Sequence, residues 1–323
     1  MRYRLNKIFR NSLLSLAWLI SAVALGQEER YLRVRELFQK NQYDSALVLL
    51  DSVILHPQTK NDPEVWTTRA FIYYKIYLRN NSEKFKRNSA LRDSTVSSLK
   101  VSESLKPDST NRENNKRLYK EISKSYHKIA KVLVEDSLNY EKSQEAFGLY
   151  KFYYKKVDPG FDFKEREIEY YKAVGSFFSD VFNKDNKNTK AGDIAKVALL
   201  KVLEMNPNDV HANLNLGLMY YNQAVVLVQS LEAGEDFAQI DIIQDNMIKL
   251  AKQSLHLINT VYTLEPENHK AMQALFYIYR MLNDIPKHEE FKVKCRERGI
   301  DIGEKKSEPL KENSENKDPN QPK

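Results

Sequence analysis

AKVALLKVLEMNPNDVHANLNLGLMY, residues 195–220, decides the fold of this chain of 323 residues. Its first half predicts a helix, because small and apolar residues recur at helical spacing at Ala195, Leu199 and Val202. Pro207 ends that helix, since proline has no backbone N–H to donate. The second half predicts another helix, whose stripe is formed by Asn213, Leu216, Gly217 and Tyr220. Two successive helices with one such stripe each are expected to pack face to face.

This order of residues resembles the tetratricopeptide repeat, in which a small residue, two apolar residues and a proline precede W-x2-L-G-x2-Y. Here the signature reads N-x2-L-G-x2-Y, with Asn213 where the family has an aromatic residue. The resemblance implies an all-α fold, an α-solenoid of about six antiparallel helix pairs that forms a TPR-like superhelix. It also implies that Gly217 permits close helix approach, which we expect at the interface between the fourth and fifth repeats.

Prolines give the length of the repeats. Those at positions 57, 107, 159, 207 and 266 are separated by 50, 52, 48 and 59 residues, whereas the family period is ~34 residues. The second repeat places Trp66 in the aromatic slot, but Arg69 where Leu is usual. In the fifth repeat, 34 residues separate Tyr220 from Ser254. We therefore predict degenerate repeats, with lengthened helices in the fifth that meet near Ala233.

The two ends of the chain differ from its centre. Residues 1–26 combine basic residues, a short apolar run and small residues before Gln27, which predicts a cleavable signal peptide. A membrane anchor is the alternative, but the run from Leu13 to Leu25 is shorter than the ~18–20 residues of a spanning helix. Residues 304–323 contain almost nothing apolar and are expected to form a disordered, charged tail. Residues 27–303 then form the TPR-like solenoid.

Charge and composition exclude several functions. Removal of residues 1–26 leaves 47 Lys and Arg against 44 Asp and Glu, so the formal charge falls from +7 to +3. A nearly balanced charge argues against a nucleic-acid partner. No metal or other cofactor is expected, because the His residues lack metal-ligand spacing and the single Cys295 has no evident base partner. These observations predict a protein that is not an enzyme.

The resemblance nominates a partner-binding groove on the first helices of the repeats. Counted from the signature slots, its residues are Arg117, Lys120, Lys124, His127, Lys172, His211, Leu214, Tyr221, Lys270, Gln273, Tyr277 and Arg280. Cations and tyrosines predominate, and the alternative is an ordinary solvated face.

One helix carries a lysine ridge, with cations at Lys116, Lys120, Lys124 and Lys128. Like charges at this spacing cost roughly 0.2–0.5 kcal/mol per pair in an isolated helix. Two hypotheses follow: an anionic partner meets the ridge, or acids of the neighbouring first helix neutralise it, namely Glu165, Glu167 and Glu169.

Taken together, the sequence predicts an exported scaffold that binds a protein or peptide partner in its concave groove, within a bacterial envelope assembly. The expected location is the periplasm, with secretion or outer-membrane association as alternatives, and no membrane span remains after cleavage of the signal. The alternative function is a glycan or small-ligand binding protein of a nutrient-uptake system.

Overall fold

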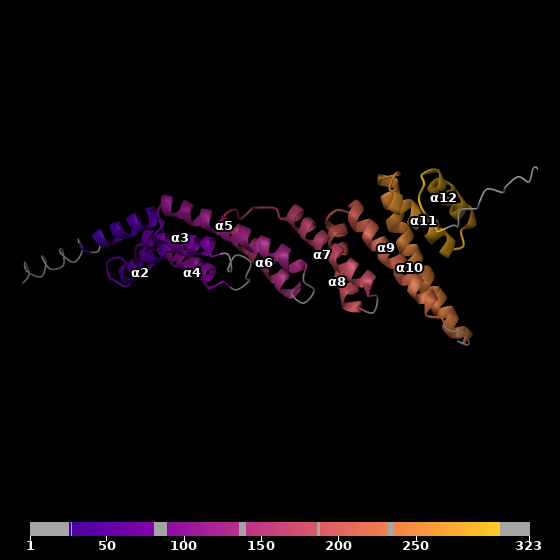
Figure 1. Cartoon of the computed structure of the whole chain (residues 1–323), viewed down its shortest axis with the longest axis horizontal. Coiled ribbons are helices and arrows are strands. Elements are labelled where there is room, and N and C mark those ends of the chain that lie inside the picture. The colour runs from indigo at the N-terminus through magenta and orange to yellow at the C-terminus, as the bar shows by residue number, and fades with distance from the viewer. Residues whose placement is uncertain are drawn as a thin grey trace, which may run out of the picture. The chain divides into compact units, whose positions relative to one another are not determined.

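The structure, a computed structural model, describes residue 26 and residues 28–80, 89–135, 140–185, 188–231 and 236–303. Within these ranges the regular structure is helical throughout, which confirms the predicted all-α fold (Figure 1). A helix over residues 28–39 precedes α2 (Tyr43–Ile54), α3 (Pro63–Arg79), α4 (Ala90–Ser104), α5 (Ser109–Val134), α6 (Tyr140–Lys155), α7 (Lys164–Lys184), α8 (Thr189–Met205), α9 (Val210–Gln229), α10 (Phe237–Leu264), α11 (His269–Met281) and α12 (Ile285–Glu297). The predicted signal peptide, residue 26 excepted, the junction near Ala233 and the tail from residue 304 lie outside the described residues.

Successive helices pack as antiparallel pairs, as expected for an α-solenoid. The chain forms two compact units, Met1–Phe177 and Phe178–Lys323. In the first unit α3 packs on α4, α5 packs on α6, and α2 and α5 both contact α3. In the second unit α8 packs on α9, α9 on α10, α10 on α11 and α11 on α12. None of the described helices is long and apolar enough to cross a lipid bilayer.

The prolines and the residues after them mark the repeat boundaries. Each of the five turn prolines follows the last residue of a second helix by two to four positions. Four of the first helices that follow, α3, α5, α9 and α11, begin at an Asp or Asn cap whose side-chain oxygen accepts a backbone N–H, which satisfies a donor left free by the helix. Three such bonds are Asn111 N to Asp108 Oδ1 at 2.7 Å, Ala212 N to Asp209 Oδ1 at 2.9 Å and Ala271 N to Asn268 Oδ1 at 3.0 Å.

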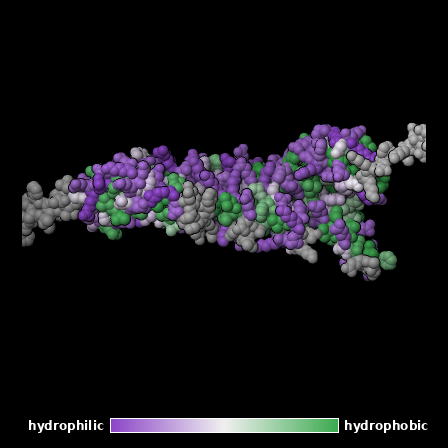
Figure 2. All heavy atoms as spheres, viewed as in Figure 1, coloured by the Kyte–Doolittle hydropathy of each residue, from purple (hydrophilic) through white to green (hydrophobic). Residues whose placement is uncertain are grey.

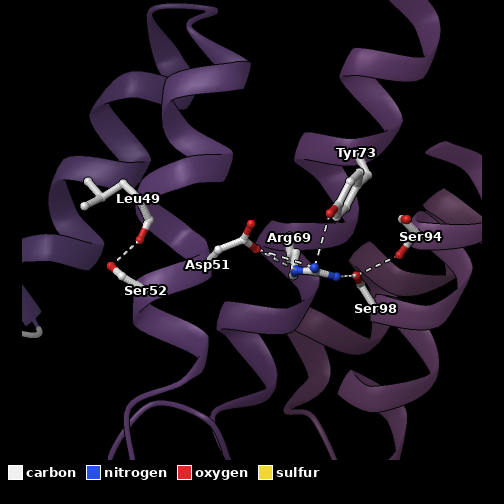
Figure 3. Close-up of polar contacts among 7 residues, drawn as sticks. All are labelled: Leu49, Asp51, Ser52, Arg69, Tyr73, Ser94 and Ser98. Carbon is white, nitrogen blue, oxygen red and sulfur yellow. Dashed lines mark hydrogen bonds and ion pairs between the residues drawn. The ribbon is translucent and has the colours of Figure 1, made fainter. Parts of the chain in front are cut away.

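Arg69 departs from the Leu of the repeat, and its polar partners explain how it is accommodated (Figure 3). Its side chain is 18% exposed and lies with Nε 3.4 Å from Asp51 Oδ1. It also donates to Ser98 Oγ at 3.1 Å and to Tyr73 Oη at 3.2 Å. These partners come from α2, α4 and α3, so one guanidinium connects three helices where a leucine would supply apolar contacts alone.

Gly217 lies at a close approach of α9 and α10. A Cβ atom at Gly217 would lie 2.7 Å from Ile258 Cδ1 and 3.4 Å from Leu257 Cβ. Ser254 Oγ donates to the Gly217 carbonyl oxygen at 2.7 Å. All three neighbours belong to α10, the second helix of the same pair. The expected close approach is present, but it lies within the fifth repeat, and its placement between the fourth and fifth repeats is wrong.

The fifth pair has lengthened helices, as the sequence predicts. α9 contains 20 residues and α10 contains 28, whereas the next first helix, α11, contains 13. Because α11 is much shorter than α10, it cannot cover the whole length of the pair. Apolar side chains are consequently exposed toward the free end, with Val228 44% and Phe237 83% exposed. Figure 2 shows this hydrophobic surface over the far end of α9 and α10.

Candidate functional site

A groove in the second unit lies between α9, α10 and α11 and has a volume of about 480 Å³. Its lining residues, which define the α9–α11 groove, are Tyr221, Val225, Val228, Gln229, Met247, Tyr277, Arg280 and Met281. Three of the predicted groove residues therefore meet in one cavity: Tyr221, Tyr277 and Arg280.

The signature tyrosine of the repeat determines where Tyr221 points. Tyr220 is 7% exposed and belongs to the core, so its successor is rotated to the edge of the apolar stripe. There the Tyr221 ring faces Tyr277, with centroids 6.3 Å apart and planes inclined by 34°. Burial raises the pKa of Tyr221, the neighbouring Tyr277 raises it further, and Arg280 opposes the shift. The Tyr221 phenol is therefore a neutral hydrogen-bonding group at physiological pH.

Arg280 is the cation of the α9–α11 groove. Its side chain is exposed, and within the described ranges it forms no ion pair. The lining residues include no Asp or Glu. The groove thus combines apolar walls, two phenols, one amide and one uncompensated positive charge, and it can accept an apolar segment that carries a carboxylate.

Gln273 has a different role from the one the resemblance implies. Its Nε2 donates to the Asp301 carbonyl oxygen at 2.6 Å, so it holds the segment that follows α12. Further along this segment, Ile302 is 7% exposed and belongs to the core of the second unit. Gly303 lies beside Tyr277, since a Cβ at Gly303 would be 3.8 Å from Tyr277 Oη. The described chain therefore ends against the wall of the α9–α11 groove.

The remaining predicted groove residues are not brought into this cavity. In the second unit, Leu214 packs against the core, and an Asn215 side chain lies 2.9 Å from the exposed His211 ring. In the first unit, the exposed surface of α5 carries Arg117, Lys120 and Lys124, and Lys172 is half-buried on α7. In the second unit, Lys270 is exposed at the start of α11.

His127 lies in an aromatic cluster and not in the cavity. Its ring stacks on Tyr150 with centroids 4.7 Å apart, and its Nε2 is buried without a hydrogen-bond partner in the described part of the chain. Burial lowers the pKa of His127, and the nearby Lys131 and Arg166 lower it further, while Glu169 acts in the opposite direction. The imidazole is consequently neutral in the folded chain at neutral pH.

We predict that His127 makes stability fall as the pH is lowered. As the pH falls below the unfolded-state pKa of ~6.5, His127 of the unfolded chain binds a proton that the folded chain does not yet bind. The free energy of unfolding therefore falls with pH between this value and the lower folded-state pKa. His127→Phe keeps the stacked ring without a titrating group. Urea unfolding at pH 7.5 and pH 5 should show a smaller loss for the variant than for the wild type. Equal losses in both proteins would contradict the assignment.

The lysine ridge is compensated in part by acids of its own helix. Lys116 Nζ lies 2.9 Å from Glu113 Oε1, and Lys124 Nζ lies 2.6 Å from Glu121 Oε1. Each pair spans three residues of α5. Lys120, which lies between them, forms no ion pair within the residues that the structure describes.

The acids expected to neutralise the ridge from α7 are engaged elsewhere. Glu167 Oε1 accepts from Lys151 Nζ at 2.6 Å, and Glu169 Oε2 lies 3.0 Å from Arg166 Nη1. The predicted neutralisation across the stack is therefore wrong for Glu167 and Glu169.

A second cavity, of about 270 Å³, lies among first helices of the first unit and was not anticipated from the sequence. Its lining is Arg35, Phe38, Gln39, Glu64, Thr67, Thr68, Phe71, Asn111 and Asn114. Asn111 is 8% exposed, and its side-chain amide forms no hydrogen bond within the described ranges. The sequence signal that could have revealed this cavity is the polar residues that follow Trp66 and those that precede Tyr119. They occupy first-helix slots equivalent to the slots from which the groove residues of later repeats were counted.

The residues that the structure describes include neither a metal-binding cluster nor an exposed thiol. Over the described ranges, no group of three or more His, Cys, Asp or Glu residues is placed to hold a metal ion. Cys295 is fully buried, and burial raises the pKa of its thiol. It therefore remains a protonated core residue at neutral pH.

Comparisons with known proteins found similar solved structures but no matching family. No family model matches the sequence, and no curated protein matches it. Similar solved structures include PilW, a widely conserved type IV pilus biogenesis factor, with a TM-score of 0.35 and 13% identity over 84% of this chain and 93% of that chain. Another is the nuclear import adaptor Nro1 of S. pombe, with a TM-score of 0.30 and 14% identity over 84% of this chain and 93% of that chain.

Proposed function

We propose that this chain is an exported, non-enzymatic helical-repeat scaffold that binds an apolar segment of a protein partner in the α9–α11 groove. The observation that carries the proposal is the meeting of Tyr221, Tyr277 and Arg280, nominated by slot counting alone, in one apolar cavity. The proposed setting is a bacterial envelope assembly, and its support is the signal-like sequence of residues 1–26.

The composition of the groove suits recognition of protein. Burial of apolar surface contributes roughly 25 cal/mol per Å², and the exposed Val228 and its neighbours offer such surface. Tyr and Arg are over-represented among residues that dominate binding energy, because they combine a large contact area with a polar end. An acidic residue beside the apolar segment would pair with Arg280, which makes an apolar and acidic segment the preferred partner.

Site-specific photocrosslinking in cells tests this function. A photoreactive amino acid at Val228, which is 44% exposed in the groove, should capture one defined protein. The matched control is Val293 of α12, which is 50% exposed and does not line the groove. Adding Tyr277→Ala should reduce capture at Val228 at least tenfold. Equal capture at the two valines, or capture unaffected by Tyr277→Ala, would exclude the groove as the binding site.

The location has its own test. Export with cleavage after Gly26 would give a mature protein whose first residue is Gln27 and which fractionates with the envelope. Cell fractionation followed by N-terminal sequencing of the native protein measures both, and an intact Met1 in the cytoplasmic fraction would contradict export.

A further inference from the structure

The segment after α12 runs along α11 toward the α9–α11 groove. Asp301 is held by Gln273, and two residues later Gly303 lies beside Tyr277. Four residues of helix rise about 6 Å, and two extended residues span about 6.6 Å. Because its first contact is with Gln273 and its next with Tyr277, the segment passes along α11 in the direction of the C-terminal end of that helix.

This path is fixed up to its last described residue. Ile302 is buried in the core of the second unit, and the Gly303 N–H donates to Asp301 Oδ1 at 2.9 Å. Gly303 has φ of 71°, a left-handed conformation that other residues rarely adopt. The chain consequently leaves the structure from a defined point on the groove wall.

Arg280 is three residues beyond Tyr277 on α11, which corresponds to a rise of about 4.5 Å. One or two further extended residues cover this distance, and the first of them is Glu304. Its carboxylate complements the charge of Arg280, which forms no ion pair within the described ranges. Leu310, the one aliphatic residue of the stretch 304–323, can lie up to about 23 Å from Gly303, within reach of Val228.

We propose that residues 304–310 occupy the α9–α11 groove in cis, with Glu304 paired to Arg280 and Leu310 against the apolar walls. The tether supplies an effective concentration on the order of mM, so a few contacts suffice for substantial occupancy. A protein partner must then displace this segment to bind. The role as a competitor rests on the proposed function, whereas the contact itself does not.

Intramolecular photocrosslinking of the full-length chain tests the contact. With a photoreactive residue in place of Leu310, at micromolar protein concentration, we expect products at monomer mass whose crosslinks map to residues 221–229 and 277–281. Arg280→Glu should reduce their yield at least threefold, and Arg280→Glu with Glu304→Arg should restore it. Lys270→Glu, which reverses an exposed cation of the same helix outside the groove, should leave the yield unchanged.

Several outcomes would overturn the proposal. These are crosslinks spread over the surface, products at dimer mass, and a yield unaffected by Arg280→Glu. A yield raised by Arg280→Glu would also do so, because it would place Lys305 or Lys306, and not Glu304, beside α11.

A second measurement separates this proposal from the proposed function. Ending the chain at Gly303 should raise partner capture at Val228 several-fold if the segment competes. Loss of all partner capture with persistent intramolecular crosslinks would leave the cis contact standing and remove the proposed function. Normal partner capture without intramolecular crosslinks, and without any gain on truncation, would leave the proposed function standing and remove the cis contact.

Discussion

Gly217→Leu is expected to reduce the free energy of unfolding by about 3 kcal/mol, the upper part of the range for overpacked cores. A Cβ alone would lie 2.7 Å from Ile258 Cδ1, and Ile258 is fully buried, so its side chain must repack within the core to make room. A larger side chain must separate α9 from α10. That movement would also lengthen the 2.7 Å hydrogen bond from Ser254 Oγ to the Gly217 carbonyl. Urea unfolding and the melting temperature measure the loss.

Gly148→Leu is the matched control for Gly217→Leu. Gly148 is also a helical glycine, but a Cβ at this position meets no atom within 4 Å. Both substitutions gain up to about 1 kcal/mol of helix propensity, so the difference between them isolates the packing clash. We expect Gly148→Leu to be neutral or stabilising. Equal melting temperatures for the two variants would contradict the close approach of α9 and α10.

The helix pairs were predictable because their signals are local. Apolar periodicity, turn prolines and Asp or Asn caps all act within one helix or one turn, as the caps Asp108, Asp209 and Asn268 illustrate. The small residue Gly217 also indicated close packing. Which helices it brings together depends on the tertiary arrangement, and the sequence pattern alone placed that contact at the wrong interface.

The candidate site was predictable only in part. Slot counting found Tyr221, Tyr277 and Arg280, because residues next to a buried signature position necessarily lie at the edge of the apolar stripe. It missed Val228 and Met247, which line the groove because α11 ends before α9 and α10 do. Relative helix length is a property of the assembled pairs, and no single repeat encodes it.

Polar pairs between different helices could not be predicted from the sequence for a related reason. Arg69 finds Asp51 and Ser98 on two other helices, and Glu167 pairs with Lys151 instead of the lysine ridge. Long charged side chains reach several candidate partners, and the choice among them depends on distances of a few ångström. Such contacts become visible only when the helices are placed.

A buried polar cluster connecting α3, α4 and α5 is the clearest case, and it leads to the second large expected effect. Asn115 is 2% exposed; its Nδ2 donates to Ser102 Oγ at 2.9 Å, and its Oδ1 accepts from Thr67 Oγ1 at 3.0 Å. The two hydroxyl oxygens lie 2.9 Å apart, which closes the cluster. Thr67 Oγ1 also lies 3.0 Å from the Pro63 carbonyl oxygen, whereas the described side-chain hydrogen bonds of Asn115 and Ser102 lie within the cluster.

Asn115→Leu should lower the free energy of unfolding by about 3 kcal/mol, because it removes two buried hydrogen bonds and leaves two hydroxyls less satisfied. Asn114→Leu, one residue earlier, is the control: Asn114 lines a cavity, is only half-buried, and forms no side-chain hydrogen bond within the described ranges, so little loss is expected. A double-mutant cycle with Ser102→Ala should show a coupling of about 1 kcal/mol, since the second deletion removes a partner already lost. Urea unfolding of the four proteins provides the cycle. Additive losses would mean that Asn115 and Ser102 stabilise the first unit independently, and that the cluster does not act as one unit.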